Sequence, residues 1–383
     1  MAHTSRSICN FILSLFESVD FLPLHRPILG DLEKSYLTDC IDSNFVSSVG
    51  ARVGEFEERL AAFTGMKRAV ATVNGTAALH VALQSVGVEQ DTEVITQPLT
   101  FAATTNAIAY TGAVPTFVDV ERETLGLSPC ALEEFLGFHT ERSGEHLINR
   151  ETGRRIVACV PVHIYGHPIR MGEVAEVCSR YGLPVIEDAA EALGSYRDGR
   201  HVGHHGRMAT LSFNGNKIIT TGGGGAIVTD NDSLADHLKH ITTTAKRPHG
   251  YEFFHDQVAY NYRLPNLNAA LGCAQMEQLP HFLEEKRKIA DAYRAFFTGS
   301  DIEFIDEPPG CRSNFWLNGV LFPDRQRRDQ FLEYSNSNSV MTRPFWTLMP
   351  DLPAFADAPC MDIPVARDLF NRGVALPSSV PNT

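Results

Sequence analysis

Apolar and polar positions follow two periods along most of the chain. From residue 54 onward, amphipathic segments with helical spacing alternate with short apolar runs, the pattern of helices between buried strands. Helices are predicted over 54–63, 76–85, 101–110 and 171–181 and from Ser128-Pro129, and strands over 68–72, 93–96, 114–118, 156–162, 183–186, 209–213 and 226–229. This rhythm predicts an α/β fold in which helices cover both faces of a mostly parallel sheet.

The alternation ends near residue 245. Residues 246–255 are rich in Pro, Gly, His and aromatics, which predicts a loop, and Pro280–Phe297 carries one apolar face, which predicts a helix. Beyond it we expect short strands and turns, and we interpret the polar stretch 137–154 as an irregular surface insertion. The predicted organisation is an N-terminal segment (1–30) packed on the body, a large α/β domain (31–250) and a smaller C-terminal α+β domain (251–383).

The apolar residues near the N-terminus predict a short amphipathic helix over 8–15 that packs on the body. A signal peptide is the weaker alternative, since Asn10 and Ser14 interrupt the stretch and no small-residue cleavage site follows. No run approaches the roughly 18 apolar residues of a membrane span, so we expect no membrane partner. The eight cysteines are scattered without a CxxC pair, which favours reduced thiols in a cytoplasmic protein.

Composition and charge narrow the class of ligand. A chain of 383 residues with 43% hydrophobic and 21% charged residues is typical of a globular protein. The formal net charge of −13 would repel a phosphate backbone, so we expect no nucleic-acid partner. The same net charge is compatible with the binding of one small anion in a locally positive pocket.

The residues with the most chemical potential lie between 186 and 229. Asp188 follows a predicted strand, and ligands of open α/β sheets bind at the carboxyl ends of strands. Lys217 has no acidic neighbour close in sequence, and burial would favour its neutral, nucleophilic amine. Gly222–Gly225 follow the lysine, so they do not form a P-loop. A surface lysine, a capping aspartate and an ordinary glycine turn are the alternatives.

Histidines form a second group of candidates. His163 and His167 flank a Tyr-Gly turn, and His201, His204 and His205 lie in a glycine-rich segment. No carboxylate or cysteine completes a ligand set, so we expect no metal. We expect His163 near a ligand and the other histidines in solvent.

Taken together, the sequence resembles the DegT/DnrJ/EryC1/StrS family of sugar-nucleotide aminotransferases. The resemblance extends from Leu22 to Ser379. It is carried by NGTAALHVAL (74–83), TFAATTNAIAYTGAVPTFVDV (100–120), VHIYGHP (162–168), EDAAEALGS (187–195), LSFNGNKIITTGGGGAIVT (211–229) and NYRLPNLNAALG (261–272). It implies pyridoxal 5′-phosphate as cofactor, with pyridoxamine 5′-phosphate as its amino form. It also implies the fold type I (aspartate aminotransferase-like) architecture of a large α/β/α domain and a smaller α+β domain.

The resemblance assigns the catalytic pair. Lys217 corresponds to the lysine that carries the cofactor as a Schiff base, and Asp188 to the carboxylate that keeps the pyridine nitrogen protonated. Glu191 occupies a position that is often Gln in the family, facing the ring hydroxyl; a glutamate there would have to be protonated or would rearrange the local hydrogen bonds.

The resemblance also assigns the remaining cofactor contacts. The turn containing Gly75 and Thr76 precedes a helix whose N-terminus would bind the cofactor phosphate together with Ser212. Phe101 would stack on the ring, unless it is an ordinary core phenylalanine. Asn261 corresponds to a residue that reaches the phosphate from the partner subunit, which implies a homodimer with shared active sites.

Three strings, TGRRIVACVPVHIYGHP (152–168), SFNGNKIITTGGGG (212–225) and VMTRPFW (340–346), resemble more specifically the 4-aminotransferases that act on UDP-4-keto-6-deoxy-N-acetylglucosamine, in the legionaminic acid and bacillosamine branch. This resemblance implies L-glutamate as amino donor and a nucleotide sugar as acceptor. His163 would contact substrate and Arg343 would bind the diphosphate, unless Arg343 is an ordinary surface arginine. The family resemblance is also compatible with a GDP- or dTDP-sugar acceptor, amination at C3, a related dehydratase, or a non-catalytic regulator. A Rossmann-type dehydrogenase is disfavoured because no GxGxxG follows the first strand.

Overall fold

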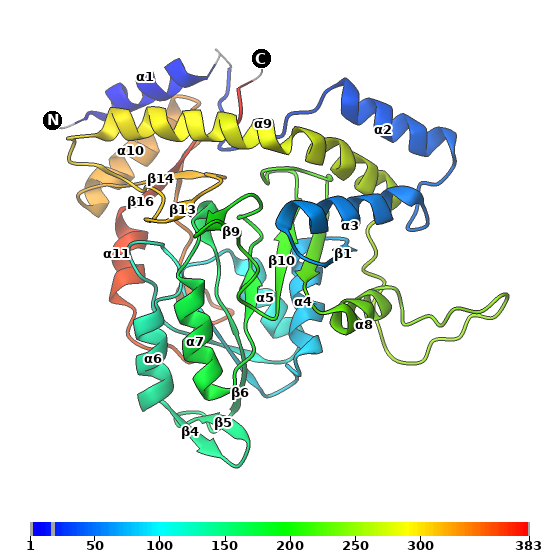
Figure 1. Ribbon diagram of the computed structural model, residues 1–383. Coiled ribbons are helices and arrows are strands. Elements are labelled where there is room, and N and C mark those ends of the chain that lie inside the picture. The colour runs from blue at the N-terminus through cyan, green and yellow to red at the C-terminus, as the bar shows by residue number, and fades with distance from the viewer. Residues whose placement is uncertain (1–2, 17–19, 382–383) are drawn as a thin grey trace.

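A central mixed sheet organises the larger part of the molecule (Figure 1). The computed structural model describes residues 3–16 and 20–381. In spatial order the strands are β1 (Arg68–Thr72), β11 (Gly225–Thr229), β10 (Met208–Ser212), β7 (Ile186–Asp188), β6 (Arg155–Val160), β2 (Glu93–Thr96) and β3 (Val114–Phe117). Parallel bridges Cys159–Val185 and Val162–Asp188 join β6 to β7. The pairs β10–β7, β6–β2 and β2–β3 are also parallel, whereas β11 is antiparallel to both neighbours. The mostly parallel sheet is confirmed.

Helices cover both faces of this sheet because its strands are apolar on both sides. In β1, Val70 faces one apolar cluster and Ala69 and Ala71 face another. The first cluster takes in α4 (Gly75–Ser85), α5 (Ala102–Tyr110) and α8 (Asp232–Thr242). Opposite it lie α3 (Ala51–Thr64), α6 (Pro129–Phe138) and α7 (Met171–Tyr181). The predicted helices and strands between residues 51 and 229 are therefore confirmed, with ends shifted by a few residues.

A smaller antiparallel sheet follows in the C-terminal part. Its order is β12 (Glu303–Phe304), β14 (Asn318–Leu321), β16 (Gly373–Leu376) and β15 (Arg343–Pro344). A minor sheet joins β13 (Cys311–Arg312), β8 (Tyr196–Arg197) and β9 (Arg200–His201). The N-terminal helix α1 (Ser5–Leu15) packs Ile8 and Ile12 against Tyr293 and Phe331, as the amphipathic pattern predicted.

Four sequence-based expectations need correction. Residues 137–154 are not irregular: β4 (Thr140–Ser143) and β5 (His146–Asn149) form a hairpin turning at Gly144, whose φ is +61°, and β5 extends the sheet through β6. The long helix α9 runs Asn266–Phe297 and contains Pro280 in its interior. Helices α10 (Arg325–Ser337) and α11 (Pro364–Arg372) stand where turns were expected. Asp188 ends β7 rather than following the strand.

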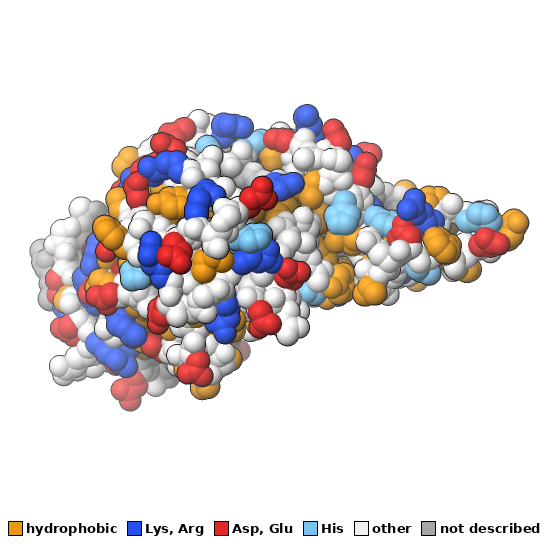
Figure 2. Space-filling view, turned by 90° about the horizontal axis from the view of Figure 1, so that it is seen from below, with side chains coloured by type: hydrophobic (Ala, Val, Ile, Leu, Met, Phe, Trp, Pro, Cys, Tyr) orange, Lys and Arg blue, Asp and Glu red, His pale blue; other side chains and the backbone are white. Residues whose placement is uncertain are grey.

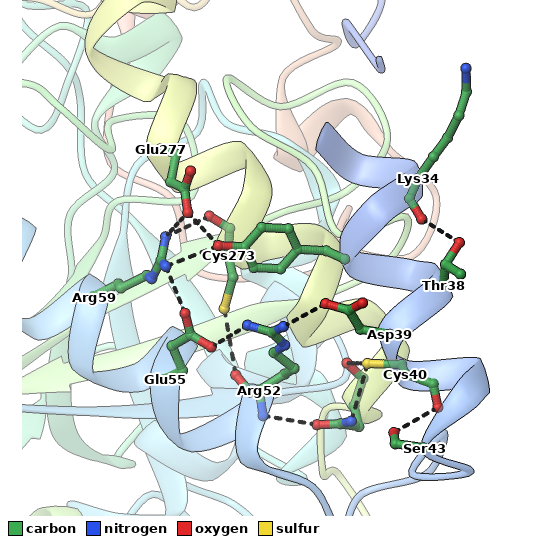
Figure 3. Close-up of polar contacts among 12 residues, drawn as sticks. Lys34, Thr38, Asp39, Cys40, Ser43, Arg52, Glu55, Arg59, Cys273 and Glu277 are labelled. Atoms are coloured by element: carbon green, nitrogen blue, oxygen red, sulfur yellow. Dashed lines mark hydrogen bonds and ion pairs between the residues drawn. The ribbon is translucent and has the colours of Figure 1, made fainter. Parts of the chain in front are cut away.

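Charged side chains fasten α2 (Asp31–Asp42) and α3 to α9 (Figure 3). Arg59 donates to Glu277 at 2.9 Å and to Glu55 at 2.6 Å, and Arg52 pairs with Glu55 and Asp39. The second half of α9 instead packs with α1 and the smaller sheet. Because α9 serves both parts, the domain boundary near residue 250 stays a prediction.

The segment between α8 and α9 projects from the body (Figure 1). It contains the predicted loop 246–255. Tyr251, Phe253 and Val258 are 85%, 78% and 95% exposed, and Figure 2 shows apolar side chains along the projection. No helix in the described ranges is long and apolar enough to cross a membrane.

Candidate active site

A cavity of about 520 Å³ lies where the carboxyl ends of β7 and β10 meet the N-termini of α4 and α5. The C-terminal part of the chain closes it from the other side. Segments far apart in sequence contribute to its wall, among them His25, Asn74, Gly75, Thr76, Phe101, Thr104, Asp188, Glu191, Ser212, Lys217, Trp316, Arg343 and Trp346. Eight of the predicted site residues therefore share one cavity.

Asp188 is buried at the base of this cavity, with 3% of its surface exposed. Its Oδ2 accepts the Thr104 hydroxyl at 2.8 Å, and its Oδ1 accepts the Ala190 N–H at 3.1 Å. Burial nevertheless raises the pKa of Asp188, and these hydrogen bonds offset the shift only in part. A cationic group in the cavity would therefore stabilise the ionised form of Asp188.

Lys217 projects into the cavity from the turn after β10. Its Nζ lies 3.3 Å from Glu191 Oε1 and 3.9 Å from the centre of the Trp316 ring. The other oxygen of Glu191 accepts the N–H of Tyr165 at 2.9 Å, and burial raises the pKa of Glu191. Lys217 has no acidic neighbour close in sequence, but the folded chain places Glu191 beside its amine.

The turn at residues 74–76 forms the N-terminus of α4. Asn74 caps the helix, its Oδ1 accepting the Ala77 N–H at 2.7 Å, while the first N–H groups of a helix have no partner within it. Two glycines allow the close packing here. A Cβ at Gly75 would lie 2.9 Å from Ser212 Cβ, and a Cβ at Gly225 would lie 2.4 Å from the Asn74 carbonyl carbon. The result is a compact anion cradle of backbone amides and hydroxyls.

These features fit pyridoxal phosphate. The cradle containing Thr76 and Ser212 suits its phosphate, and the buried carboxylate of Asp188 suits a protonated pyridine nitrogen. Lys217 supplies a primary amine in the same cavity. The opposite charges of a ring nitrogen and Asp188 would relieve the cost of burying that carboxylate.

Phe101 and Arg343 lie at the more exposed part of the wall. Phe101 caps α5 with 55% of its surface exposed, and its ring centre lies 6.1 Å from that of Trp346. Arg343 Nη1 donates to Asn336 Oδ1 at 2.9 Å and to the Thr342 carbonyl at 3.0 Å. The remaining guanidinium donors can serve a ligand.

His163 does not line the cavity, and the expectation that it contacts substrate is corrected. It is fully buried, its Nδ1 accepts the Ile169 N–H at 3.2 Å, and its Nε2 donates to Glu187 at 3.1 Å. Glu187 also accepts backbone N–H groups of Gly203, His205 and Gly206. His163 follows a strand, as site residues often do, but the turn aims it into this internal network.

Asn261 lies outside the cavity of its own chain. It is exposed, and its Oδ1 accepts the Arg263 guanidinium N–H at 3.0 Å. It sits near the base of the projecting segment, where it forms a bridge with Thr243. Its role in a partner subunit's site stays a prediction.

Sequence reasoning missed His25 and Trp316 as wall residues. The Nδ1 of His25 is buried without a partner in the described part of the chain. Burial lowers the pKa of His25 well below its usual range, and the nearby Lys286 and Lys217 lower it further. His25 lies in the first residues that resemble the family, so the sequence could have indicated it. Trp316 lies outside every motif, and nothing in the sequence pointed to it.

The expectation that the remaining histidines lie in solvent is wrong for His167 and His201, which are both buried. His201 is buried, accepting the Gly194 N–H at 2.8 Å, and His204 contacts the Thr64 carbonyl at 2.9 Å. Burial lowers the pKa of His201 to about 4. Across residues 3–16 and 20–381, no group of three or more His, Cys, Asp or Glu side chains is arranged to hold a metal ion.

Comparison with known proteins gives consistent matches over most of the chain. The DegT/DnrJ/EryC1/StrS aminotransferase family matches residues 27–382. A GDP-perosamine synthase of Escherichia coli O157:H7 is 36% identical over 94% of this chain and 93% of its own. Another, of Vibrio cholerae, is 35% identical over 93% and 94%. The crystal structure of the aminotransferase TlmJ from Streptoalloteichus hindustanus is 25% identical and superposes with a TM-score of 0.85 over 94% of this chain and 93% of that one.

Proposed function

Because the chain belongs to the DegT/DnrJ/EryC1/StrS aminotransferase family, whose members use pyridoxal phosphate, we propose that it moves the amino group of L-glutamate to C4 of a nucleotide-linked 4-keto-6-deoxy sugar. The enzyme is a sugar aminotransferase with the fold of the type I pyridoxal phosphate enzymes. The observation that carries the proposal is the convergence of Lys217, Asp188 and the 74–76 turn on one cavity.

Each residue has a role that its surroundings support. Gly75, Thr76 and Ser212 would bind the cofactor phosphate, and Asp188 would hold the ring nitrogen in its protonated form. Phe101, at the exposed side of the cavity, would stack on the ring. When bound, the cofactor supplies an electron sink for the carbon that loses or gains a proton.

Lys217 is the catalytic acid and base. With the cofactor bound, its amine would take a proton from the α-carbon of glutamate, and in the second half-reaction it would deliver a proton to C4 of the sugar. Glu191, 3.3 Å from this amine, accepts its hydrogen bond and balances its charge.

Two acceptors are candidates for the second half-reaction. The sequence motifs favour UDP-4-keto-6-deoxy-N-acetylglucosamine, which would give a UDP-linked 4-amino-4,6-dideoxy sugar. The similarity to two GDP-perosamine synthases at 35–36% identity favours a GDP-linked 4-keto-6-deoxy sugar instead. In either case Arg343, at the open side of the cavity, would bind the diphosphate.

The proposal includes a homodimer. Asn261 lies on the exposed base of the projecting segment, away from its own cavity. We infer that it completes the phosphate site of a partner subunit, so a monomer would be inactive. Mixing two inactive variants, K217A and N261A, tests this sharing: one intact site per heterodimer should restore part of the activity.

The test of function is a two-step assay. Adding L-glutamate to the loaded enzyme should convert the cofactor absorbance to that of the pyridoxamine form. The UDP- and GDP-linked 4-keto sugars are then supplied side by side, and NMR of the product fixes the position and configuration of the new amine. An unchanged spectrum with glutamate would contradict the proposal and favour a non-catalytic binding protein.

A further inference from the structure

Trp316 contacts both Lys217 and the residue before it, Asn216. The face of its indole lies 3.9 Å from the lysine Nζ, a distance at which an ammonium is attracted to the ring. Its indole N–H donates to the backbone carbonyl of Asn216, the residue before Lys217, at 2.6 Å. One side chain therefore fixes both the backbone and the head of the lysine.

Trp316 is itself held firmly. Its N–H donates to Asn314 Oδ1 at 2.8 Å, and its carbonyl accepts the buried Nζ of Lys286 at 2.7 Å. Only 4% of its surface is exposed. Asn314 also donates to the backbone carbonyl of Glu191 at 2.9 Å. The same asparagine therefore holds the backbone of both Trp316 and Glu191.

The amine thus lies between an indole face and a carboxylate. The lysine side chain is 11% exposed, and its four rotatable bonds would otherwise let the amine leave the reacting carbon. These two contacts restrict the amine to the part of the cavity beside the Glu191 carboxylate.

We propose that Trp316 is the positioning residue of Lys217, holding its amine beside Glu191 in the cavity where the proton transfer would take place. The inference rests on the proposed role of Lys217. It predicts that losing the indole slows proton transfer and the return of the lysine, while the cofactor still binds. Binding of glutamate should change little.

The contact can be tested in the cofactor-free protein, because the chain has only two tryptophans, Trp316 and Trp346. W346F leaves Trp316 as the single tryptophan, and W316F leaves Trp346, so excitation at a wavelength that tyrosine does not absorb reports on one indole in each protein. K217M, which removes the charge but keeps the chain length, should change the emission of the first protein and leave that of the second unchanged. Emission of Trp316 that does not respond to K217M would overturn the proposal.

Single-turnover kinetics test the consequence. W316L should slow the glutamate half-reaction about tenfold with little change in the concentration of glutamate giving half the maximal rate. W316F keeps the aromatic face and should recover most of the rate. Equal losses in the two variants, or a wild-type rate in W316L, would overturn the proposal, and circular dichroism checks that both fold.

The proposed function has its own separate readout. Borohydride reduction of loaded wild-type enzyme, followed by peptide mapping, should place the cofactor on Lys217. If no label appears there, the proposed function fails, and the fluorescence result alone decides whether Trp316 holds the amine. If the label appears but Trp316 is insensitive to K217M, only the positioning role fails.

Discussion

Two lysines contact Trp316 at different points: Lys217 is partly buried, and Lys286 is fully buried. Lys217 lies against the ring, faces a cavity and pairs with Glu191. Lys286 has no exposed surface and donates to the carbonyls of Trp316 and Ser378. Within the described chain no carboxylate bonds to Lys286, and burial lowers its pKa well below its usual range.

The comparison shows that burial alone does not create a reactive lysine. Desolvation favours the neutral amine at a site such as that of Lys286, yet no substrate can reach it there. Lys217 keeps a route to solvent through the cavity and an acid that balances its charge. The reactivity proposed for Lys217 would therefore depend on access and on a charge partner, whereas Lys286 ties α9 to the wall of the cavity.

The largest expected effect comes from removing the accessible lysine. K217A should lower the rate of amino transfer by at least about a thousandfold, because no other amine lines the cavity among the described residues to move the proton. The measurement is product formation from a 4-keto sugar nucleotide and glutamate. Transamination at the wild-type rate would contradict the role of Lys217.

The next effect comes from the carboxylate opposite it. D188N keeps an oxygen for the Thr104 hydroxyl but removes the negative charge, so the ring nitrogen would no longer be held protonated. We expect the glutamate half-reaction to slow by about a hundredfold, as followed by stopped-flow absorbance. A rate equal to that of wild type would show that the cofactor does not rely on Asp188.

Substituting the inaccessible lysine should affect stability. K286M leaves two carbonyls without their donor and should lower the free energy of unfolding by about 2 kcal/mol near the ordinary lysine pKa, where the protonation difference between the folded and unfolded chains contributes least. The pH dependence gives the sharper result. Because folding lowers the pKa of Lys286, the unfolded chain binds the extra proton, and wild-type stability falls as the pH drops below the ordinary lysine range.

K286M should remove the contribution of Lys286 to the pH dependence of the free energy of unfolding. In wild type the group contributes a slope of about 1.4 kcal/mol per pH unit in this window, measurable by urea unfolding at pH 9 and pH 7. An unchanged slope in K286M would mean that Lys286 stays charged when buried.

The smallest expected effect comes from the acid beside Lys217. Burial raises the pKa of Glu191, so acidification protonates it early and removes the charge that faces the lysine amine. The rate of the wild-type glutamate half-reaction should therefore fall on the acid side of its pH profile. E191Q should be about tenfold slower and should lack that acid limb. A limb that persists in E191Q would assign the titration to another group.

Local pattern predicted most of the α/β part. Strand 93–96 and helix 171–181 match in both ends, since period and flanking residues decide such elements. The helix α10 was missed because its sequence RQRRDQFLEYSNS is largely polar, and it forms by packing Phe331 into the C-terminal core. The start of α9 was missed because Pro280 resembles a helix N-terminus, although this helix accommodates it internally.

The sequence likewise predicted only part of the candidate site. The motifs identified Lys217, Asp188, Ser212 and the 74–76 turn, which line one cavity. They placed His163 wrongly, since its position after a strand does not reveal that its ring turns inward. Trp316 lies outside every motif and reaches its place through the packing of the C-terminal part.

The sequence by itself determined the alternation of strands and helices, the acidic charge and the motif residues of a sugar aminotransferase, because these follow from local period and residue chemistry. Only the tertiary structure decided which groups surround the lysine amine. Glu191 is 26 positions from Lys217, and Trp316 bonds to a residue 100 positions away. Such contacts depend on how the whole chain packs, since side chains distant in sequence meet only when the elements carrying them are brought together.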